Sequence, residues 1–100
     1  MSLIIESISA HQLCLKGPLD VSTIRQIWLL GHQLIDKAEP NAQLALDLSG
    51  VTSADSASVA LLLDWLRHAK KQNKQLNCCQ LPEKIQEIIR VSNLESLFDM

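Results

Sequence analysis

The most restrictive feature of this sequence is a change of hydrophobic period near its middle. Leu44, Leu46 and Leu48 alternate with other residues, which is the period of a β-strand with one buried face. A polar segment follows, and from about Asp55 to Gln72 apolar residues recur at three- and four-residue steps, the period of an α-helix. A strand that leads directly into a long amphipathic helix favours a fold in which helices cross over a sheet.

The remaining periodic segments complete the same kind of fold. Gly17-Pro18 is expected to end an opening strand pair, Asp20 to cap the first helix, and residues 49–53 to form a turn. The expected elements are strands at Leu3–Ile8 and Gln12–Lys16, a helix at Val21–Ala38, a strand at Gln43–Leu48, a helix at Asp55–Gln72, a strand at Gln75–Gln80, a helix that starts with Pro82, and a turn at Leu94–Phe98. This β-β-α-β-α-β-α order predicts one α/β domain over residues 1–100, with a mixed four-stranded sheet and crossover helices.

Composition and charge narrow the classes of partner. The 100 residues are 47% hydrophobic and 20% charged, as in an ordinary globular domain, and the formal net charge is −2. The one dense basic run, residues 67–71, falls at an expected helix end, where cations complement the helix dipole. We therefore expect no nucleic-acid partner. Because the N-terminus lacks a signal-peptide pattern and no apolar run approaches about 20 residues, we expect a cytoplasmic protein.

The sequence offers little support for catalysis. His11, His32 and His68 fall on three different elements without metal-ligand spacing, so we expect no metal site. The chain also lacks a nucleophile-elbow motif and a glycine-rich phosphate loop, so we expect no enzyme activity and no cofactor. The chain has three cysteines, an odd number, and we expect them to be reduced thiols in the core. The enzymatic alternative is a thiol oxidoreductase that uses Cys78 or Cys79.

The start of the helix at 55–72 is the strongest candidate for a functional site. A Ser56 hydroxyl there would face unpaired backbone N–H groups and the positive end of the helix dipole, so these donors could hold an added phosphate. The like charge of Asp55 would oppose that addition. Capping of the helix by Asp55, Ser53 or Ser56 is the structural alternative.

The same helix is expected to carry an anchor for a partner. The expected core face holds Val59, Leu62, Leu63 and Leu66. Leu61, Trp65 and His68 would then face solvent with Ala57, because about 100° separates successive residues of a helix. A leucine and a tryptophan exposed on adjacent turns are typical of binding hot spots. Coverage of both side chains by another element is the alternative.

The segment from Leu46 to Leu63 resembles the core motif of STAS domains. Its strand with Asp47, its polar loop, its Asp55-Ser56 pair and its leucine-rich helix match the motif in order, and the element order matches over nearly the whole chain. The resemblance implies that Ser56 stands at the position that anti-sigma-factor antagonists use as phospho-acceptor.

Within the family, the run Ala60 to Leu63 and the stand-alone length look most like the MlaB subfamily. These are cytoplasmic subunits of a bacterial ABC system that moves phospholipid to maintain outer-membrane lipid asymmetry. The resemblance implies a regulatory subunit that binds a transporter ATPase of the MlaF type and reaches the membrane only through that complex. The expected partner-binding residues are Asp55, Ser56, Ala57, Leu61, Trp65 and His68. An anti-sigma-factor antagonist that is switched by phosphorylation of Ser56 is the alternative function.

Overall fold

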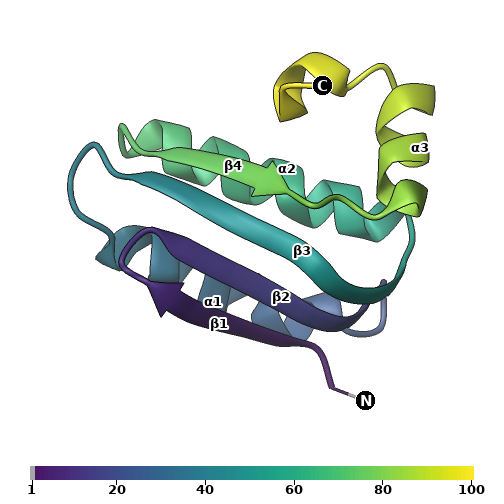
Figure 1. Cartoon of the computed structure of the whole chain (residues 1–100), viewed down its shortest axis with the longest axis horizontal. Coiled ribbons are helices and arrows are strands. Elements are labelled where there is room, and N and C mark those ends of the chain that lie inside the picture. Colours follow the sequence, from purple (N-terminus) through teal and green to yellow (C-terminus); the bar gives the residue numbers. More distant parts are fainter. Residues whose placement is uncertain (1) are drawn as a thin grey trace.

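The chain is built around one mixed sheet in the computed structural model, which describes residues 2–100. The strands are β1 (Ile4–Ser9), β2 (Gln12–Leu19), β3 (Gln43–Ala54) and β4 (Gln75–Cys79), in the spatial order β1-β2-β3-β4 (Figure 1). β1 and β2 pair antiparallel, whereas β2–β3 and β3–β4 are parallel. The helices are α1 (Ile24–Lys37), α2 (Ser56–Lys71), α3 (Glu83–Val91) and a terminal 3₁₀ turn, η1 (Glu95–Phe98). The predicted α/β class and the mixed four-stranded sheet are confirmed.

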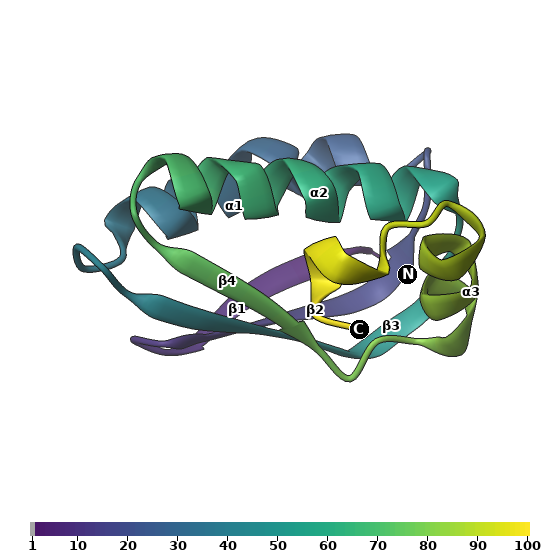
Figure 2. The same ribbon diagram turned by 90° about the horizontal axis from the view of Figure 1, so that it is seen from above.

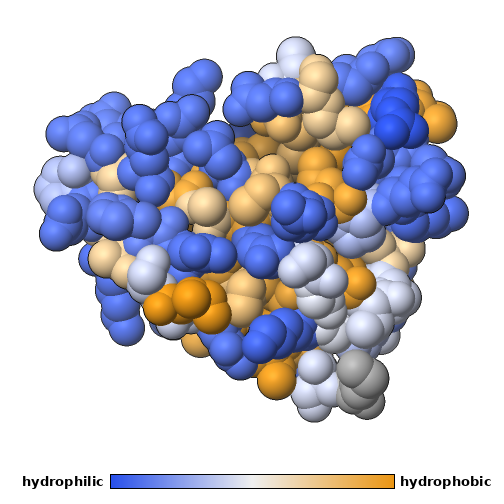
Figure 3. All heavy atoms as spheres, in the orientation of Figure 1, coloured by the Kyte–Doolittle hydropathy of each residue, from blue (hydrophilic) through white to orange (hydrophobic). Residues whose placement is uncertain are grey.

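The molecule has two layers and one uncovered sheet face. Figure 2 shows α1 and α2 side by side on one face of the sheet, with α3 at its end. The core lies between these layers and is dominated by leucines from the two central strands. The opposite face is seen in Figure 3, where hydrophobic side chains lie among hydrophilic ones. Among residues 2–100, no helix is long and apolar enough to span a membrane.

The two central strands run further than the sequence indicated. Residues 49–53 were expected to form a turn, but they continue β3, and Gly17-Pro18 continues β2, so both predictions are wrong. Gly17 pairs with Val51 next to irregularities in the register, and parallel pairing satisfies backbone groups that a local turn would leave open. Gly17 has φ of +108°, and a Cβ there would lie 2.6 Å from the Ser2 carbonyl oxygen, so glycine is required at this position.

The start of α1 also differs from expectation. The helix begins at Ile24, and Asp20, the expected cap, closes a turn before it by accepting hydrogen bonds from the backbone N–H and the hydroxyl of Ser22, at 2.9 and 2.6 Å. These bonds hold the pKa of Asp20 below its ordinary value. Val21, which was expected inside the helix, is therefore exposed in the loop between β2 and α1.

Candidate functional site

The N-terminus of α2 is held by a cap that also joins two loops. Asp55 is the N-cap residue; its Oδ1 accepts a hydrogen bond from the Ala57 N–H at 2.9 Å. Its Oδ2 accepts a second bond, from the Val21 N–H in the β2–α1 loop at 3.2 Å. One carboxylate thus satisfies an open helix donor and fixes the neighbouring loop beside the helix start. The alternative given above, that Asp55 caps the helix, is therefore correct.

Ser58 completes this cap and was missed by the sequence analysis. Its hydroxyl accepts a hydrogen bond from the Asp55 N–H at 3.1 Å and donates to the Leu19 carbonyl at the end of β2. The side chain is fully buried, so its polar atom needs both partners. The spacing Asp55-x-x-Ser58 is the signal that could have identified it, because the third helical residue closes a capping box.

Ser56 lies on the solvent side of this arrangement. It is the first residue of α2 and is exposed, while Asp55 and Ala57 on either side are half-buried. Asp55 already accepts the Ala57 N–H, so a phosphate on Ser56 would compete with a carboxylate for the donors at this helix end. The Ser56 hydroxyl is therefore accessible from solvent, and phosphorylation would change both the charge and the cap.

Leu61 and Trp65 are core residues, so the prediction that they face solvent is wrong. Leu61 is 0% exposed and Trp65 is 1% exposed. The Trp65 ring lies so close to α1 that a Cβ on Gly31 would come within 2.1 Å of it, and its indole N–H donates to the Trp28 carbonyl at 3.0 Å. Neither side chain can anchor a partner while the domain is folded.

The physical reason is that α2 contacts three neighbours, α1, β4 and α3. α1 covers the side of the helix that carries Trp65, and Val59, Leu61 and Leu62 are buried as well. At about 100° per residue, Val59 and Leu61 stand roughly 160° apart, so the buried arc is much wider than the single stripe that the sequence analysis assumed.

His68 belongs to a polar network between the two helices, which we call the seam network. The rings of His68 and His32 stack with centroids 4.0 Å apart. His68 Nε2 lies 2.8 Å from Asp36 Oδ1, and His32 Nε2 lies 2.6 Å from Asp64 Oδ2. His68 therefore contacts α1, and His32 and Asp36 take part in the same contact between the helices.

The seam network lowers the pKa values of both carboxyl groups. Burial alone would raise the pKa of Asp64, but hydrogen bonds from His32 and Trp28 more than offset it. Hydrogen bonds from Gln72 and His68 lower the pKa of Asp36. Both carboxylates are ionised at neutral pH, and they connect α1 to α2 over several turns.

The surface of α2 that stays open to a partner lies on its outer side. Ser56, Ala60 and Arg67 are exposed and Leu63 is half-buried; these four residues follow one another at three- and four-residue steps and are called the outer stripe. The outer stripe therefore forms one continuous surface along the helix, and Ser56 is its first residue. Of the six predicted partner-binding residues, Asp55, Ser56 and Ala57 lie together at its N-terminal end.

Asp47, which the resemblance places in the family motif, lies away from this surface. Asp47 accepts a hydrogen bond from the Ser49 N–H at 2.8 Å and is separated from Asp55 by seven residues of strand, roughly 25 Å at about 3.3 Å per residue.

The two cysteines at the end of β4 have thiols with raised pKa values. Burial raises the pKa of the Cys78 thiol to about 12, and burial and the Asp47 charge raise the pKa of the Cys79 thiol. Raised thiol pKa values oppose the reactive thiolate that an oxidoreductase requires.

Comparisons with known proteins give one family match and several structures with a similar fold. A family model described as "Mlab, STAS domain" matches residues 6–99. The fold is similar to an anti-sigma-factor antagonist (STAS) domain protein from Planctomyces limnophilus, with 17% identity, a TM-score of 0.75, and coverage of 98% of this chain and 87% of the other. No curated protein sequence matches the chain.

The Bacillus cell fate determinant SpoIIAA is a second structural neighbour. In its phosphorylated form it is 16% identical with a TM-score of 0.70, and the match covers 96% of this chain and 87% of that one. The unphosphorylated anti-sigma-factor antagonist SpoIIAA is 15% identical with a TM-score of 0.67, over 89% and 82%. At these identities the likeness establishes the fold alone.

Proposed function

We propose that this chain, which belongs to the STAS domain family, is a non-catalytic regulatory subunit that binds the ATPase of a bacterial ABC phospholipid transporter. The observation that carries the proposal is the exposed Ser56 at the start of a rigidly capped helix. The name Mlab in the matching family description supports the finer assignment to phospholipid transport. In this proposal the protein is cytoplasmic and reaches the membrane only through the transporter.

The chemistry of the site fits a contact surface. The cap fixes the backbone on both sides of Ser56, so a partner meets the exposed hydroxyl at a defined position of the chain. Ala60 next to it is small and exposed, which permits close approach by a helix or loop of the ATPase. Asp55, Ser56 and Ala57 form the contact, and the ATPase supplies the nucleotide chemistry.

The direct test is affinity capture of the tagged chain from its own bacterium, followed by identification of the retained proteins. Recovery of an ABC ATPase with wild type, and its loss with Ser56→Glu, supports the proposal. Gln43→Glu is the matched control, because it adds the same charge at an exposed position at the start of β3. Capture of an anti-sigma factor or kinase in place of an ATPase would overturn the transport function.

An anti-sigma-factor antagonist is the second candidate, favoured by the fold shared with SpoIIAA and by the accessible Ser56 hydroxyl. Transfer of the γ-phosphoryl group of ATP to Ser56 by a partner kinase would release ADP and add about −1.5 to −2 charge beside Asp55. Incubation with the bacterium's lysate and ATP, followed by mass measurement, distinguishes the candidates: a phosphate on Ser56 favours the antagonist.

A further inference from the structure

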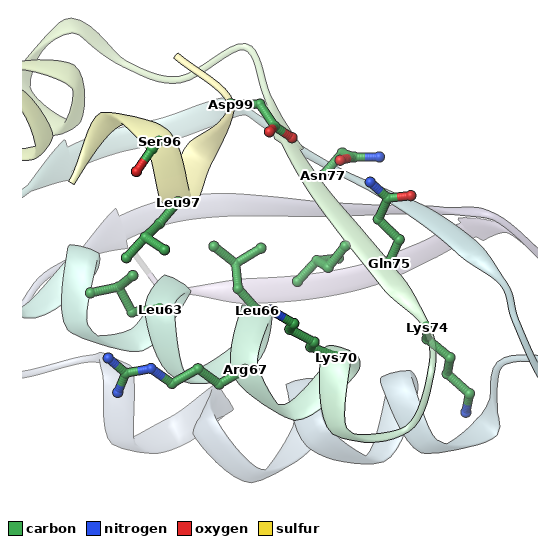
Figure 4. A pocket seen from close by; sticks show the side chains of 11 residues that line it. Leu63, Leu66, Arg67, Lys70, Lys74, Gln75, Asn77, Ser96, Leu97 and Asp99 are labelled. Carbon is green, nitrogen blue, oxygen red and sulfur yellow. The ribbon is translucent and has the colours of Figure 1, made fainter.

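A solvent-open groove lies on the side of α2 that faces the edge of the sheet. We call it the edge groove; its volume is about 540 Å³, and it is bounded by α2, β4 and η1. Leu63 and Leu66 from α2 and Leu97 from η1 converge in it (Figure 4), and Leu76 of β4 contributes to the same apolar lining. Leu97 is 52% exposed, so the groove leaves apolar surface in contact with water.

The α2 wall of the groove is basic in a chain whose net charge is negative. Arg67 and Lys70 line it and are exposed. The helix dipole accounts for a cation in the last turn, such as Lys70, but Arg67 precedes that turn. Lys74 also lines the groove, yet its Nζ donates to the carbonyls of Ile35 and Asp36 at 2.7 and 3.0 Å and is committed to α1.

The opposite wall offers backbone hydrogen-bonding groups. β4 is the last strand in the sheet order, and its Gln75 N–H donates to the Ala42 carbonyl at 2.9 Å. In a parallel ladder, alternate residues point their N–H and C=O groups toward the same neighbour, so those of Leu76 and Cys78 point toward the free edge. Such an edge can accept an added strand from another chain.

The edge groove is continuous with the outer stripe. Leu63 and Arg67 belong to both, which places the groove two to three turns along α2 from Ser56. A partner that contacts Ser56 can therefore extend along the helix into the groove. Its segment would need apolar side chains for the leucine lining and carboxylates for the α2 wall.

We propose that the edge groove binds an acidic, amphipathic peptide segment of the partner that docks at Ser56. The inference rests on the proposed function only in taking that partner as the source of the segment. Arg67 and Lys70 outnumber the one carboxylate of the lining, Asp99, so charge complementarity and the leucine lining set the composition of the segment, and the free edge of β4 favours an extended conformation. Ion pairs to Arg67 and Lys70 give selectivity for acidic over basic segments.

The test is a titration of the full ¹⁵N-labelled chain with a synthetic peptide of about ten residues that alternates leucine and glutamate. We expect saturable amide shifts confined to residues 63–78 and 94–100, and no saturation with the peptide in which lysine replaces glutamate. The variant Arg67→Gln, Lys70→Gln should weaken binding about threefold to tenfold. Equal binding of both peptides, or saturable shifts elsewhere, would overturn the proposal.

Two controls make the outcome specific. Arg25→Gln, Lys84→Gln removes the same two charges from exposed positions on α1 and α3 and should bind like wild type. Vesicles of phosphatidylglycerol that shift the groove residues, when the acidic peptide does not, would make the groove a lipid site and overturn the peptide proposal. If the ATPase is captured but the acidic peptide causes no amide shifts, only this inference is wrong. If the peptide binds the groove but no ATPase is captured, only the proposed function is wrong.

Discussion

The two long sides of α2 differ in what they do. The side toward α1 carries Leu61 and Trp65, is sealed from water, and is reinforced by the seam network. The outer stripe is exposed at Ser56, Ala60 and Arg67, and its Leu63 packs partly against the core. Leu61 and Trp65 therefore belong to the buried side of α2, and Ser56 and Ala60 belong to its exposed side. Substitutions should separate stability from binding along this division.

Trp65→Ala should have the largest effect on folding. It removes a fully buried indole and its hydrogen bond to the Trp28 carbonyl, so we expect a loss of about 3–5 kcal/mol in the free energy of unfolding. Urea denaturation followed by circular dichroism measures the change. Ser56→Ala on the outer stripe is the control and should stay within about 0.5 kcal/mol of wild type. A urea midpoint of Trp65→Ala close to that of wild type would contradict the claim that Trp65 is packed in the core between α2 and α1.

Gly31→Ala should have the next largest effect, because a Cβ there overlaps the Trp65 ring. We expect a loss of about 1–3 kcal/mol, typical of an overpacked contact. A double-mutant cycle with Trp65→Leu, a smaller side chain, sharpens the test: the cost of Gly31→Ala should fall when the indole is absent. Additive effects of the two changes would show that the glycine and the tryptophan are not packed together.

Asp55→Ala should cost about 1 kcal/mol, since it removes the cap of α2. The bond to the Val21 N–H is lost in the same variant, so amide hydrogen exchange should also become faster in the β2–α1 loop. Asp55→Asn keeps the acceptor and should recover most of the stability. Unchanged exchange at Val21 in Asp55→Ala would show that the cap does not fix this loop.

The smallest effect on folding is expected from acid titration of the seam network. The pKa of Asp64 in the folded chain is below its ordinary value, so its stabilising contribution is complete above that ordinary value and is lost as the pH falls through the folded value. The stability difference between wild type and Asp64→Asn should therefore shrink from about pH 6 to about pH 3. Urea unfolding across this range measures it, and a constant difference would contradict the network.

The sequence predicted the parts of this molecule that depend on local pattern. The order of the elements, the start of α2 near Asp55 and the helix after Pro82 follow from period and capping, and they are confirmed. It failed where tertiary contacts decide: residues 49–53 form strand because β2 lies alongside, and Trp65 is buried because Gly31 lets α1 approach. Helical period alone cannot tell how many neighbours cover a helix.

The candidate site divides in the same way. Asp55, Ser56 and Ala57 could be placed at the helix start from sequence, whereas His68 could not be assigned to the seam network without knowing that α1 and α2 are adjacent. Ser58 was overlooked because a small polar residue between apolar ones gives no signal of burial. The edge groove needs residues from α2, β4 and η1, and no local pattern predicts that combination.

The most direct test of the account is a paired measurement of unfolding midpoint and ATPase affinity for Ser56→Glu, with Gln43→Glu as the charge-matched control. The account predicts that the free energy of unfolding of both variants stays within about 0.5 kcal/mol of wild type, because both positions are exposed. It predicts that Ser56→Glu alone loses affinity for the captured ATPase, by about tenfold or more. Wild-type affinity in a folded Ser56→Glu chain would show that the start of α2 is not the docking surface.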